Sequence, residues 1–553
     1  MERNQFNDGA VSPRRIAQRP PVWPVALVIA LLAMPPVAQA FEVATGNDEL
    51  KIRWDNTVKY STGMRLKEPS SKLTADANQD DGNRNFDKGS LISNRFDLLS
   101  EFDLTYRNMG FRVSGAAWYD DVYNRDNDHD SPFTVNSASV VNNKFTKATR
   151  DLHGRKAELL DYFVFGKAEV GDSLVNLRLG SHTLLYGESL FFGGNGIAAA
   201  QAPIDFVKLL SVPNTQFKEL MRPIPQVSAQ IQLNSTLSVG GYYQFSWDAD
   251  RLPAAGSYFS GADILDRGGE RFLLGPGFFL ARTDDVEARN SGQGGIQLRI
   301  RPAGQDVEYG LYAANFHAKS PVVFLDFPRG VYGMVYPEDI RTVGASMTTT
   351  VAEANVGMEI SYRDNMPLIN RAGGVPVPPG VVVDNDDNPL YAVGKTLHGQ
   401  ISMIALLHPT MLWEGGSFMG EIAAHHVLSV SKNDAARDPN STDTAAALRF
   451  VFSPGYYQVF GGVDINVPIG LGYGLYGRSP LSHPGFSVER GGDFSIGVAG
   501  DYLKVWKFGL TYTRFFGDSD NALTPPNSAN PYYSYKQNLK DRDFISLTFQ
   551  RTF

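Results

Sequence analysis

The 553-residue sequence lacks cysteine altogether, which excludes a disulfide scaffold, a thiolate metal site and a cysteine nucleophile. It also lacks an excess of basic charge. Lys and Arg number 51 against 59 Asp and Glu, so the formal net charge is -8 and nucleic acid is not an expected partner. A mean hydropathy of -0.22 excludes a bundle of membrane helices. No phosphate-binding, dinucleotide-binding or metal-binding motif stands out, so we expect no cofactor.

The N-terminus carries the most marked apolar run of the sequence, Val25–Met34. A transmembrane helix needs about 20 residues, and this run is only half as long. Arginines precede the run and Ala38-Gln39-Ala40 follows it, which together predict a secretory signal peptide over residues 1–40. The mature chain would then be residues 41–553. An uncleaved membrane anchor is the alternative.

Beyond residue 40 the sequence alternates between apolar and polar residues over long stretches. From Leu50 to Leu66 the even positions are mostly apolar and the odd positions are polar. Strands of soluble proteins average about 5–6 residues, whereas a strand tilted across a bilayer needs about 9–11, with one apolar and one polar face. The length of the alternation therefore indicates transmembrane strands.

Segments of this kind recur along the whole chain. They lie near residues 50–66, 95–107, 111–120, 157–170, 174–183, 225–234, 236–247, 293–302, 307–317, 340–351, 354–363, 396–407, 416–430, 445–453, 456–473, 492–503, 505–516 and 541–553. Short turns, among them Pro454-Gly455, alternate with long loops. The sequence therefore predicts an all-β fold, a transmembrane antiparallel β-barrel of about 18 strands (16–18). A periplasmic β-sandwich is the alternative.

The chain ends on an aromatic residue, Phe553, after an alternating segment. This ending resembles the terminal signal that the outer-membrane assembly machinery recognises, although Arg551 departs from it. We therefore expect the protein in the outer membrane of a Gram-negative cell.

The segment 184–224 does not alternate. Its glycine run predicts a bend, and Pro203 predicts the start of a short amphipathic helix. We expect this partly helical segment to fold into the lumen as a constriction or hatch; an exposed loop is the alternative. The hatch candidates are Gly193, Gly194, Gly196, Pro203, Ile204, Val207, Lys208 and Leu210.

Charged residues of the predicted strands are expected to face the lumen, because Lys or Arg on the lipid face costs about 2–4 kcal/mol near the midplane. Such residues either select the solute or pair with each other to hold the barrel. The candidates are Lys51, Arg53, Asp55, Lys59, Glu359, Arg363 and Glu421.

Two long loops are rich in Asp and Asn, around residues 76–87 and 121–130. Carboxylate and amide oxygens suit calcium, but neither loop has the spacing of an EF-hand. A solvated surface loop, or bridging of lipopolysaccharide by divalent cations, are the alternatives. Among the histidines of the later strands, only His408, His425 and His426 suggest catalysis, and no nucleophile motif accompanies them, so we do not expect an enzyme.

Several stretches resemble a family of Gram-negative envelope proteins known as domain of unknown function 1302. They are Arg178–Gly180 through Tyr186–Ser189, Tyr336–Arg341, Glu359–Arg363 followed by Pro367, Asp464–Pro468 and Asp541–Phe544. The resemblance covers essentially the whole mature chain. It implies an outer-membrane barrel associated with uptake or export of hydrophobic compounds such as steroids, alkanes or fatty acids, and it assigns no functional residues.

Together these observations predict an outer-membrane channel or transporter that passes a small hydrophobic or amphipathic solute through a gated lumen. A general or anion-selective porin is the first alternative, and a lipid-acting enzyme or adhesion barrel is the second. The expected partners are outer-membrane lipid and lipopolysaccharide, the solute, and a component of an envelope export or uptake system.

Overall fold

A computed structural model describes residues 41–43, 45–212, 216–371, 373–482, 485–528 and 530–553. The predicted signal peptide, residues 1–40, lies outside the described residues, and so do residues 213–215 of the predicted hatch.

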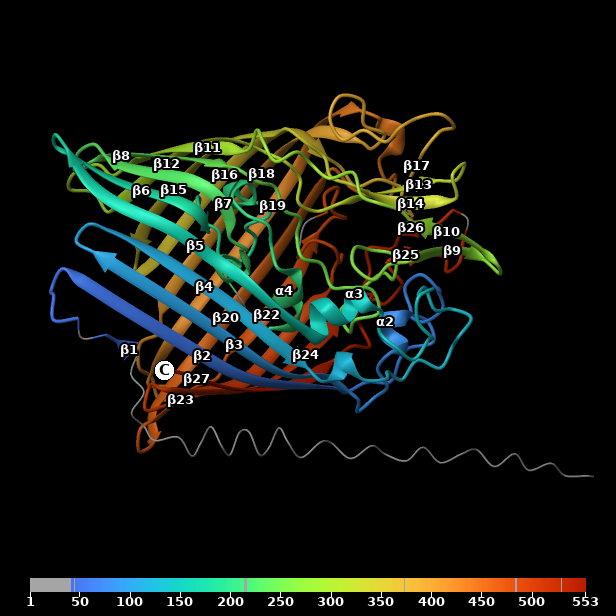
Figure 1. Ribbon diagram of the computed structural model, residues 1–553, viewed down its shortest axis with the longest axis horizontal. Coiled ribbons are helices and arrows are strands. Elements are labelled where there is room, and N and C mark those ends of the chain that lie inside the picture. Colours follow the sequence, from blue (N-terminus) through green and yellow to red (C-terminus); the bar gives the residue numbers. More distant parts are fainter. Residues whose placement is uncertain (1–40, 44, 213–215, 372, 483–484, 529) are drawn as a thin grey trace, which may run out of the picture. The chain divides into compact units, whose positions relative to one another are not determined.

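The described chain forms a closed antiparallel β-barrel (Figure 1). Its sheet has 20 strands. The two-residue β1 (Phe41–Glu42) only pairs beside the start of β2, and β21 and β22 pair with the same two neighbours and act as one strand. Eighteen barrel strands result, which confirms the predicted fold class. The sheet closes because β27 pairs with β2, from Thr57 opposite Thr552 to Arg65 opposite Phe544. Closure leaves no strand edge exposed to lipid.

The barrel strands are β2 (Leu50–Arg65), β3 (Leu91–Tyr106), β4 (Met109–Asp120), β5 (Arg155–Val170), β6 (Ser173–His182), β7 (Ile224–Gln232), β8 (Leu237–Gln244), β11 (Gly294–Ile300), β12 (Val307–Phe316), β15 (Ile340–Val351), β16 (Ala354–Pro367), β18 (Val393–Leu406), β19 (Gly415–Lys432), β20 (Thr444–Phe460), β21 (Val463–Asn466) with β22 (Ile469–Tyr476), β23 (Gly492–Tyr502), β24 (Trp506–Phe516) and β27 (Phe544–Thr552).

The predicted turn at Pro454-Gly455 is wrong. β20 continues through both residues to Phe460, and the turn to β21 follows. Pro454 cannot donate a backbone hydrogen bond, but its carbonyl accepts one from Val467 N at 2.9 Å. Proline is tolerated in a sheet where the ladder is irregular, and the β20–β21 register shifts just beyond it, before Phe460.

The barrel is apolar outside and polar inside. On β18, the outward side chains of Leu397 and Ile401 are 37% and 53% exposed, whereas the inward side chains of His398 and Gln400 are buried. Leu510 of β24, at 47% exposed, belongs to the same outer surface. This distribution is the reverse of that in a soluble protein, and it suits a barrel whose outer surface contacts lipid.

Long loops fold together over one end of the barrel, here called the long-loop end; the other end carries short turns (Figure 1). A second, five-stranded sheet lies in these loops. It consists of β9 (Arg271–Gly275), β10 (Phe278–Arg282), β13 (Val322–Asp326), β14 (Val331–Val335) and β17 (Val375–Pro376). Two further short strands, β25 (Leu523–Thr524) and β26 (Tyr532–Tyr533), pair with each other.

Helices of the described residues are short. They are α2 (Asp81–Arg84), η1 (Val122–Asn124), α3 (Lys147–Thr149), η2 (Arg150–Gly154), η3 (Ile197–Ala200), α4 (Phe206–Ser211), α5 (Phe217–Leu220) and η4 (Asp434–Ala436). In the described ranges, no helix has both the length and the apolar character needed to span a bilayer.

The loops at this end are held by buried arginines. Arg65, at the end of β2, donates to the carbonyl oxygens of Asn83 at 2.8 Å and Phe86 at 2.6 Å, and it forms an ion pair with Asp541. An aromatic cluster packs beneath it. Its buried members are Phe86, Ile92, Tyr123, Phe145, Tyr258, Phe515, Leu539 and Phe544. Loops from distant parts of the chain therefore form one packed unit, here called the mouth plug.

The inside-out distribution of polarity leads to a test on two neighbouring residues of β24. Replacing Leu510 by Lys should lower the free energy of unfolding by about 2–4 kcal/mol, because the charge would enter the lipid. Replacing Thr511 by Lys, on the opposite face of β24, should lower the free energy of unfolding by less than half of that amount. Urea unfolding of both variants in lipid vesicles measures the difference. Equal losses would mean that the two faces are assigned wrongly.

Candidate functional site

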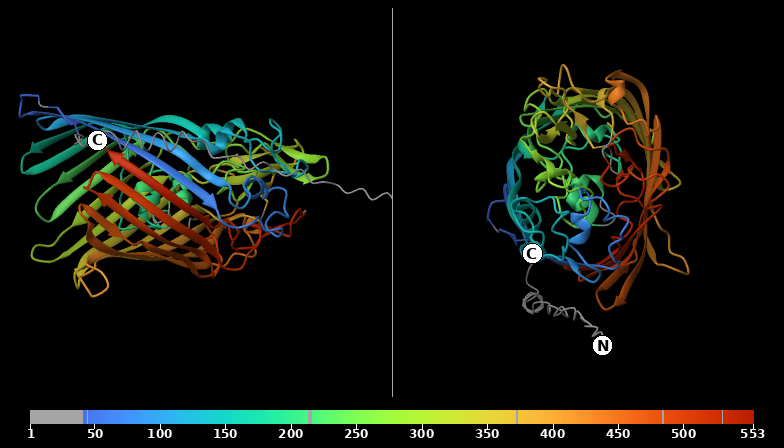
Figure 2. Two further views of the ribbon diagram at one scale, coloured as in Figure 1. Left: turned by 90° about the horizontal axis from the view of Figure 1, so that it is seen from below. Right: turned by 90° about the vertical axis from the view of Figure 1, so that its right-hand side faces the viewer.

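The segment between β6 and β7 lies inside the ring of strands. Figure 2 (right), which looks at the barrel from the long-loop end, shows α4 of this segment within the ring, and Figure 1 agrees. Residues 184–201 form its first part, here called the wall segment, because they are bonded to the inner face of β16, β18 and β19. Residues 205–212 and 216–220 belong to an excursion that contains α4 and α5.

Glu421 of β19 is a buried anchor of the wall segment. Its carboxylate accepts hydrogen bonds from Ser189 Oγ at 2.9 Å and from the backbone N–H of Phe192 at 2.9 Å. The backbone N–H groups of Leu190 and Phe191 donate to the same carboxylate. Four donors therefore converge on one acidic side chain, which is 2% exposed.

Glu359 and Arg363 of β16 hold the next part of the wall segment. Glu359 accepts from the backbone N–H groups of Glu188, at 2.9 Å, and Ile197. Arg363 donates to the carbonyl oxygens of Asn195 at 2.8 Å and Gly196 at 2.7 Å. Among the described residues no ion pair joins Glu359 to Arg363. The carboxylate accepts from backbone N–H groups of the wall segment, and the guanidinium donates to its backbone C=O groups, so strand side chains satisfy a backbone that is mostly irregular.

Two glycines allow this close approach. A Cβ atom on Gly196 would lie 2.6 Å from Glu359 Oε1, and one on Gly193 would lie 2.2 Å from the ring of Phe217. Gly194 contributes its carbonyl oxygen to Arg363, at 3.2 Å. The glycine run was predicted to provide a bend, and these contacts give it a further role, because the backbone must approach side chains closely.

Asn195 joins the wall segment to β18 and β19. Its Oδ1 lies 3.0 Å from His398 Nδ1 and 3.1 Å from His425 Nδ1. The Nε2 atom of His425 lies 3.0 Å from Ser479 Oγ. The three side chains of Ser479, His425 and Asn195 are arranged like the nucleophile, the base and the orienting residue of a catalytic triad. However, all three side chains are at most 2% exposed, and Ser479 also donates to a backbone carbonyl, so the arrangement is packed and closed to a substrate.

The helix of the excursion begins later than predicted. α4 begins at Phe206, not at Pro203, and the side chain of Asp205 caps it by accepting from Lys208 N at 3.0 Å. An Asp before the first turn is a stronger N-cap than Pro203 could provide. Pro203 and Ile204 instead pair with the chain as it returns. Ile204 bridges to Met221, and Arg222 N donates to Pro203 O at 2.9 Å.

The remaining hatch candidates Val207, Lys208 and Leu210 lie on α4 and are half-buried. Lys208 donates to the carbonyl oxygen of Glu219, which closes the excursion on itself. Asp205 forms an ion pair with Arg251, 2.8 Å apart, and Arg251 also pairs with Glu158 of β5 at 2.5 Å. The excursion is thereby joined to the opposite side of the barrel.

The predicted lumen residues separate into two groups. Glu359, Arg363 and Glu421 come together around the wall segment. The four residues of β2 do not join them: Arg53 pairs with buried Asp55 at 2.6 Å, Lys51 is exposed, and Lys59 lies opposite Asp97 of β3.

His398 and Asn195 belong to the site but were not predicted. The inward phase of 396–407 could have identified His398, whereas the position of Asn195 depends on tertiary contacts.

The wall segment covers only one side of the lumen. Inward side chains of β16, β18 and β19 are buried beneath it. Many inward side chains of β24, β27, β2 and β3 are instead half-exposed hydroxyl, amide or charged groups. They include Thr511, Ser546, Thr548, Gln550, Lys59, Ser61, Arg95 and Asp97. We call this the open wall.

A polar cavity of about 300 Å³ adjoins the wall segment at the short-turn end. Its lining includes Glu188, Arg299, Arg301 and Glu308. Arg299 pairs with Glu308 and lies 3.5 Å from the carboxylate of Glu188. Burial raises the pKa of Glu188. The cavity therefore places charged groups of both signs beside the wall segment.

Comparisons with known proteins identify one family. The family model described as "Protein of unknown function (DUF1302)" matches residues 23–553. No curated protein matches the sequence. Among solved structures, the chain is similar to Acinetobacter baumannii OccAB2 (9% identity, TM-score 0.42), Pseudomonas aeruginosa OpdK with vanillate (9%, 0.38) and a BenF-like porin from Pseudomonas fluorescens Pf-5 (10%, 0.39). Each comparison covers 91% of this chain and 98% of the other.

Loss of the Glu421 carboxylate should release the wall segment. In Glu421→Ala, buried donors lose their acceptor, and each costs about 1–3 kcal/mol. We expect amide hydrogen exchange in residues 189–197 to accelerate roughly hundredfold, since 1.4 kcal/mol corresponds to a factor of ten, while β24 and β27 keep their protection. The matched control is Glu353→Ala, which removes an exposed carboxylate in the β15–β16 turn. Unchanged exchange in 189–197 would contradict the anchor role.

Proposed function

Because the chain belongs to the DUF1302 family, whose description assigns no activity, we propose its function from the geometry of the lumen: a membrane channel for a small solute, narrowed by the segment between β6 and β7. One observation carries the proposal. The wall segment is bonded to one side of the barrel, and the opposite, open wall presents half-exposed polar side chains. A barrel built only for stability would not need a polar, solvent-accessible wall facing a fixed internal segment.

The outer membrane is the proposed location. A belt of exposed apolar side chains around a closed barrel supports insertion in a bilayer, and single-chain barrels with an even number of strands are characteristic of the bacterial outer membrane. Lipid and lipopolysaccharide are then the proposed neighbours of the outer surface. The signal peptide at residues 1–40 would direct export.

Two barriers control passage in this proposal. The mouth plug closes the long-loop end through contacts such as those of Arg65, and the excursion with α4 narrows the lumen behind it. A solute crosses when the plug loops separate and the excursion moves, while the wall segment stays fixed by Glu359, Arg363 and Glu421. The division between fixed and moving parts follows burial. The residues of α4 are half-buried, whereas the anchors Glu359, Arg363 and Glu421 are fully buried.

The proposed solute is a small amphipathic organic molecule. Several charges on this side of the lumen form ion pairs, such as Arg95 with Asp97 on β3 at 2.5 Å, and Arg112 of β4 with Asp103 of β3 at 2.6 Å. Paired charges give little preference for anions, which disfavours an anion-selective porin. A purely hydrophobic solute would find few apolar contacts along this wall, so the hydrophobic preference implied by the family resemblance is narrowed to molecules that also carry a polar group.

Removing the excursion tests the gated channel. Residues 205–220 can be replaced by two glycines, because Ile204 and Met221 already pair. The deletion keeps residues 184–201 and their anchors on β16, β18 and β19, although it removes the bond from Phe217 N to Leu190 O. We expect the intact protein to conduct weakly in planar bilayers, and the shortened variant to conduct several-fold more with longer openings. Hydrogen exchange of residues 189–197 is the control for an unchanged wall segment. Large, steady conductance steps from the intact protein, equal to those of the variant, would instead support an open porin.

A further inference from the structure

At the short-turn end, the inner face of the barrel carries exposed apolar side chains. Ile404 and Leu406 of β18 share a face with Ser402, whose hydroxyl donates to the carbonyl oxygen of Glu188 in the wall segment at 2.8 Å. Both apolar side chains therefore point into the lumen, where they are 38% and 76% exposed. Apolar side chains on the outer face meet lipid, but these two meet the lumen. An apolar surface exposed to water is a candidate binding surface.

A row of inward side chains changes from polar to apolar as it crosses four strands. Thr350 of β15 is paired with Asn355 of β16, which is paired with Ile404 of β18. Ile404 is in turn paired with Met419 of β19. Directly paired side chains have Cβ atoms about 4.5–5.5 Å apart. The four residues therefore form a continuous strip, here called the inner strip, with a polar end and an apolar end.

The polar end of the inner strip belongs to the cavity of about 300 Å³ at the short-turn end. Thr350 and Asn355 line this cavity together with Arg299 of β11. Arg299 and Arg301 both form ion pairs with Glu308, the second at 2.8 Å. The Nε atom of Arg299 is buried and has no hydrogen-bond partner among the described residues. A hydrogen-bond donor is therefore unused in the lining of the cavity.

The apolar end of the inner strip lies against the segment that narrows the lumen. Gln216 Nε2 of the excursion donates to Met419 Sδ at 3.3 Å, and Phe217 N donates to Leu190 O at 2.8 Å. Met419 and Leu190 pack against one apolar cluster between the wall segment and the barrel. A molecule bound on the inner strip would therefore contact both the barrel and the inserted segment.

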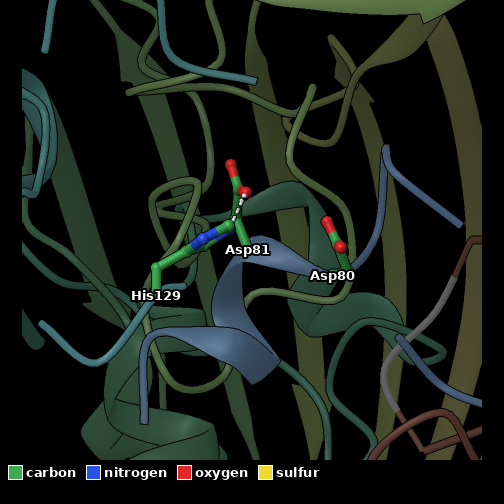
Figure 3. Close-up of side chains that lie close together, drawn as sticks. All are labelled: Asp80, Asp81 and His129. Atoms are coloured by element: carbon green, nitrogen blue, oxygen red, sulfur yellow. Dashed lines mark hydrogen bonds and ion pairs between the residues drawn. The ribbon is translucent and has the colours of Figure 1, made fainter. Parts of the chain in front are cut away.

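The buried polar cluster of the mouth plug differs from this cavity (Figure 3). Both carboxylate oxygens of Asp81 are engaged: Oδ1 lies 3.0 Å from His129 Nε2, and Oδ2 accepts from Asn136 N at 3.1 Å. Asp80 forms an ion pair with Arg84 at 2.5 Å. These contacts join the loop after β2 to the loop after β4. The cluster thus holds the plug loops together, whereas the cavity keeps a donor for a ligand.

The charges of the cavity determine the kind of head group that fits. The lining carries both signs, Arg299 and Arg301 against Glu188, Asp306 and Glu308. An anionic head group would compete with Glu308 for the two guanidinium groups, and a cationic one would compete with the guanidinium groups for Glu308. A neutral hydroxyl or carbonyl oxygen can accept from Arg299 Nε without breaking an ion pair. The cavity therefore favours a neutral, hydrogen-bonding head group.

We propose that the cavity and the inner strip bind an amphipathic molecule with a neutral hydroxyl or carbonyl head group. The head group occupies the cavity and accepts from Arg299, and the apolar body covers Ile404, Leu406 and Met419. This inference rests on the channel proposal, because it names the solute class at one position along the lumen. Binding is measured at equilibrium and conductance is measured separately, so the two proposals can fail independently.

Binding can be tested on the full mature chain in lipid nanodiscs, with ¹³C-labelled methionine methyl groups observed by NMR. Met419 reports the apolar end of the inner strip. Met403, on the opposite face of β18 from Ile404, reports partitioning of the ligand into lipid. Hexan-1-ol should shift the Met419 signal saturably and the Met403 signal only in proportion to its concentration. Hexanoate and hexylammonium, with the same chain, should bind roughly fivefold more weakly, because a charged head group must disrupt an ion pair.

Two substitutions separate the halves of the site. Ile404→Thr should weaken hexan-1-ol binding roughly fivefold through loss of apolar contact. Its matched control is Ile401→Thr, on the lipid face of the same strand, which should bind within about twofold of the native chain. Arg299→Lys keeps the positive charge beside Glu308 but removes the Nε donor, and it should also weaken binding. Arg329→Lys, at an exposed arginine of the β13–β14 turn, is the control for that change.

Other outcomes would overturn the proposal. A Met419 shift that stays proportional to the Met403 shift would mean that hexan-1-ol only enters the lipid. Tighter binding of hexanoate than of hexan-1-ol would overturn the neutral head group. Unchanged binding in both Ile404→Thr and Arg299→Lys would place the ligand elsewhere. If Ile404→Thr does not refold, Leu406→Thr provides the same comparison at a more exposed position.

Discussion

Backbone hydrogen bonding is the constraint on which this structure depends. In a bilayer, an unpaired N–H or C=O group costs several kcal/mol, so the strands close into a barrel through β2 and β27. The same constraint applies inside. The wall segment has no regular secondary structure over most of its length, and its backbone groups are satisfied by side chains that strands project inward. Glu421 and Glu359 accept from its N–H groups, and Arg363 donates to its carbonyls.

This arrangement divides the interior into fixed and movable parts. The wall segment is held at several points by fully buried charged groups, and breaking one contact leaves a buried charge unpaired, which is costly. Within the excursion, α4 has a cap, an ion pair between Asp205 and Arg251 and no fully buried residue, so this helix can move at lower cost than α5, whose Phe217 and Leu220 are buried. At the long-loop end, the mouth plug combines aromatic packing with buried arginines.

Much of the fold could be predicted from the sequence, because alternation over a dozen residues has few explanations other than a transmembrane strand. The inward phase also identified Glu359, Arg363 and Glu421, since a charge on the lipid face is costly. The error at Pro454 arose because proline was assumed to end a strand, whereas its carbonyl still joins the ladder. Asn195 could not be predicted: its partners His398 and His425 lie more than a hundred positions away in the sequence, and no local pattern records such contacts.

The route of the solute along the open wall is the central claim, and the absence of cysteine makes it directly testable. Single cysteines can replace Thr548 on the open wall, Ser361 beneath the wall segment, and Leu547 on the lipid face. Conductance is then recorded in planar bilayers while a charged, water-soluble thiol reagent is added. We predict that the reagent reduces conductance in Thr548→Cys and has no effect in Ser361→Cys or Leu547→Cys. Loss of conductance in Ser361→Cys, with Thr548→Cys unaffected, would contradict the proposed route and place it behind the wall segment.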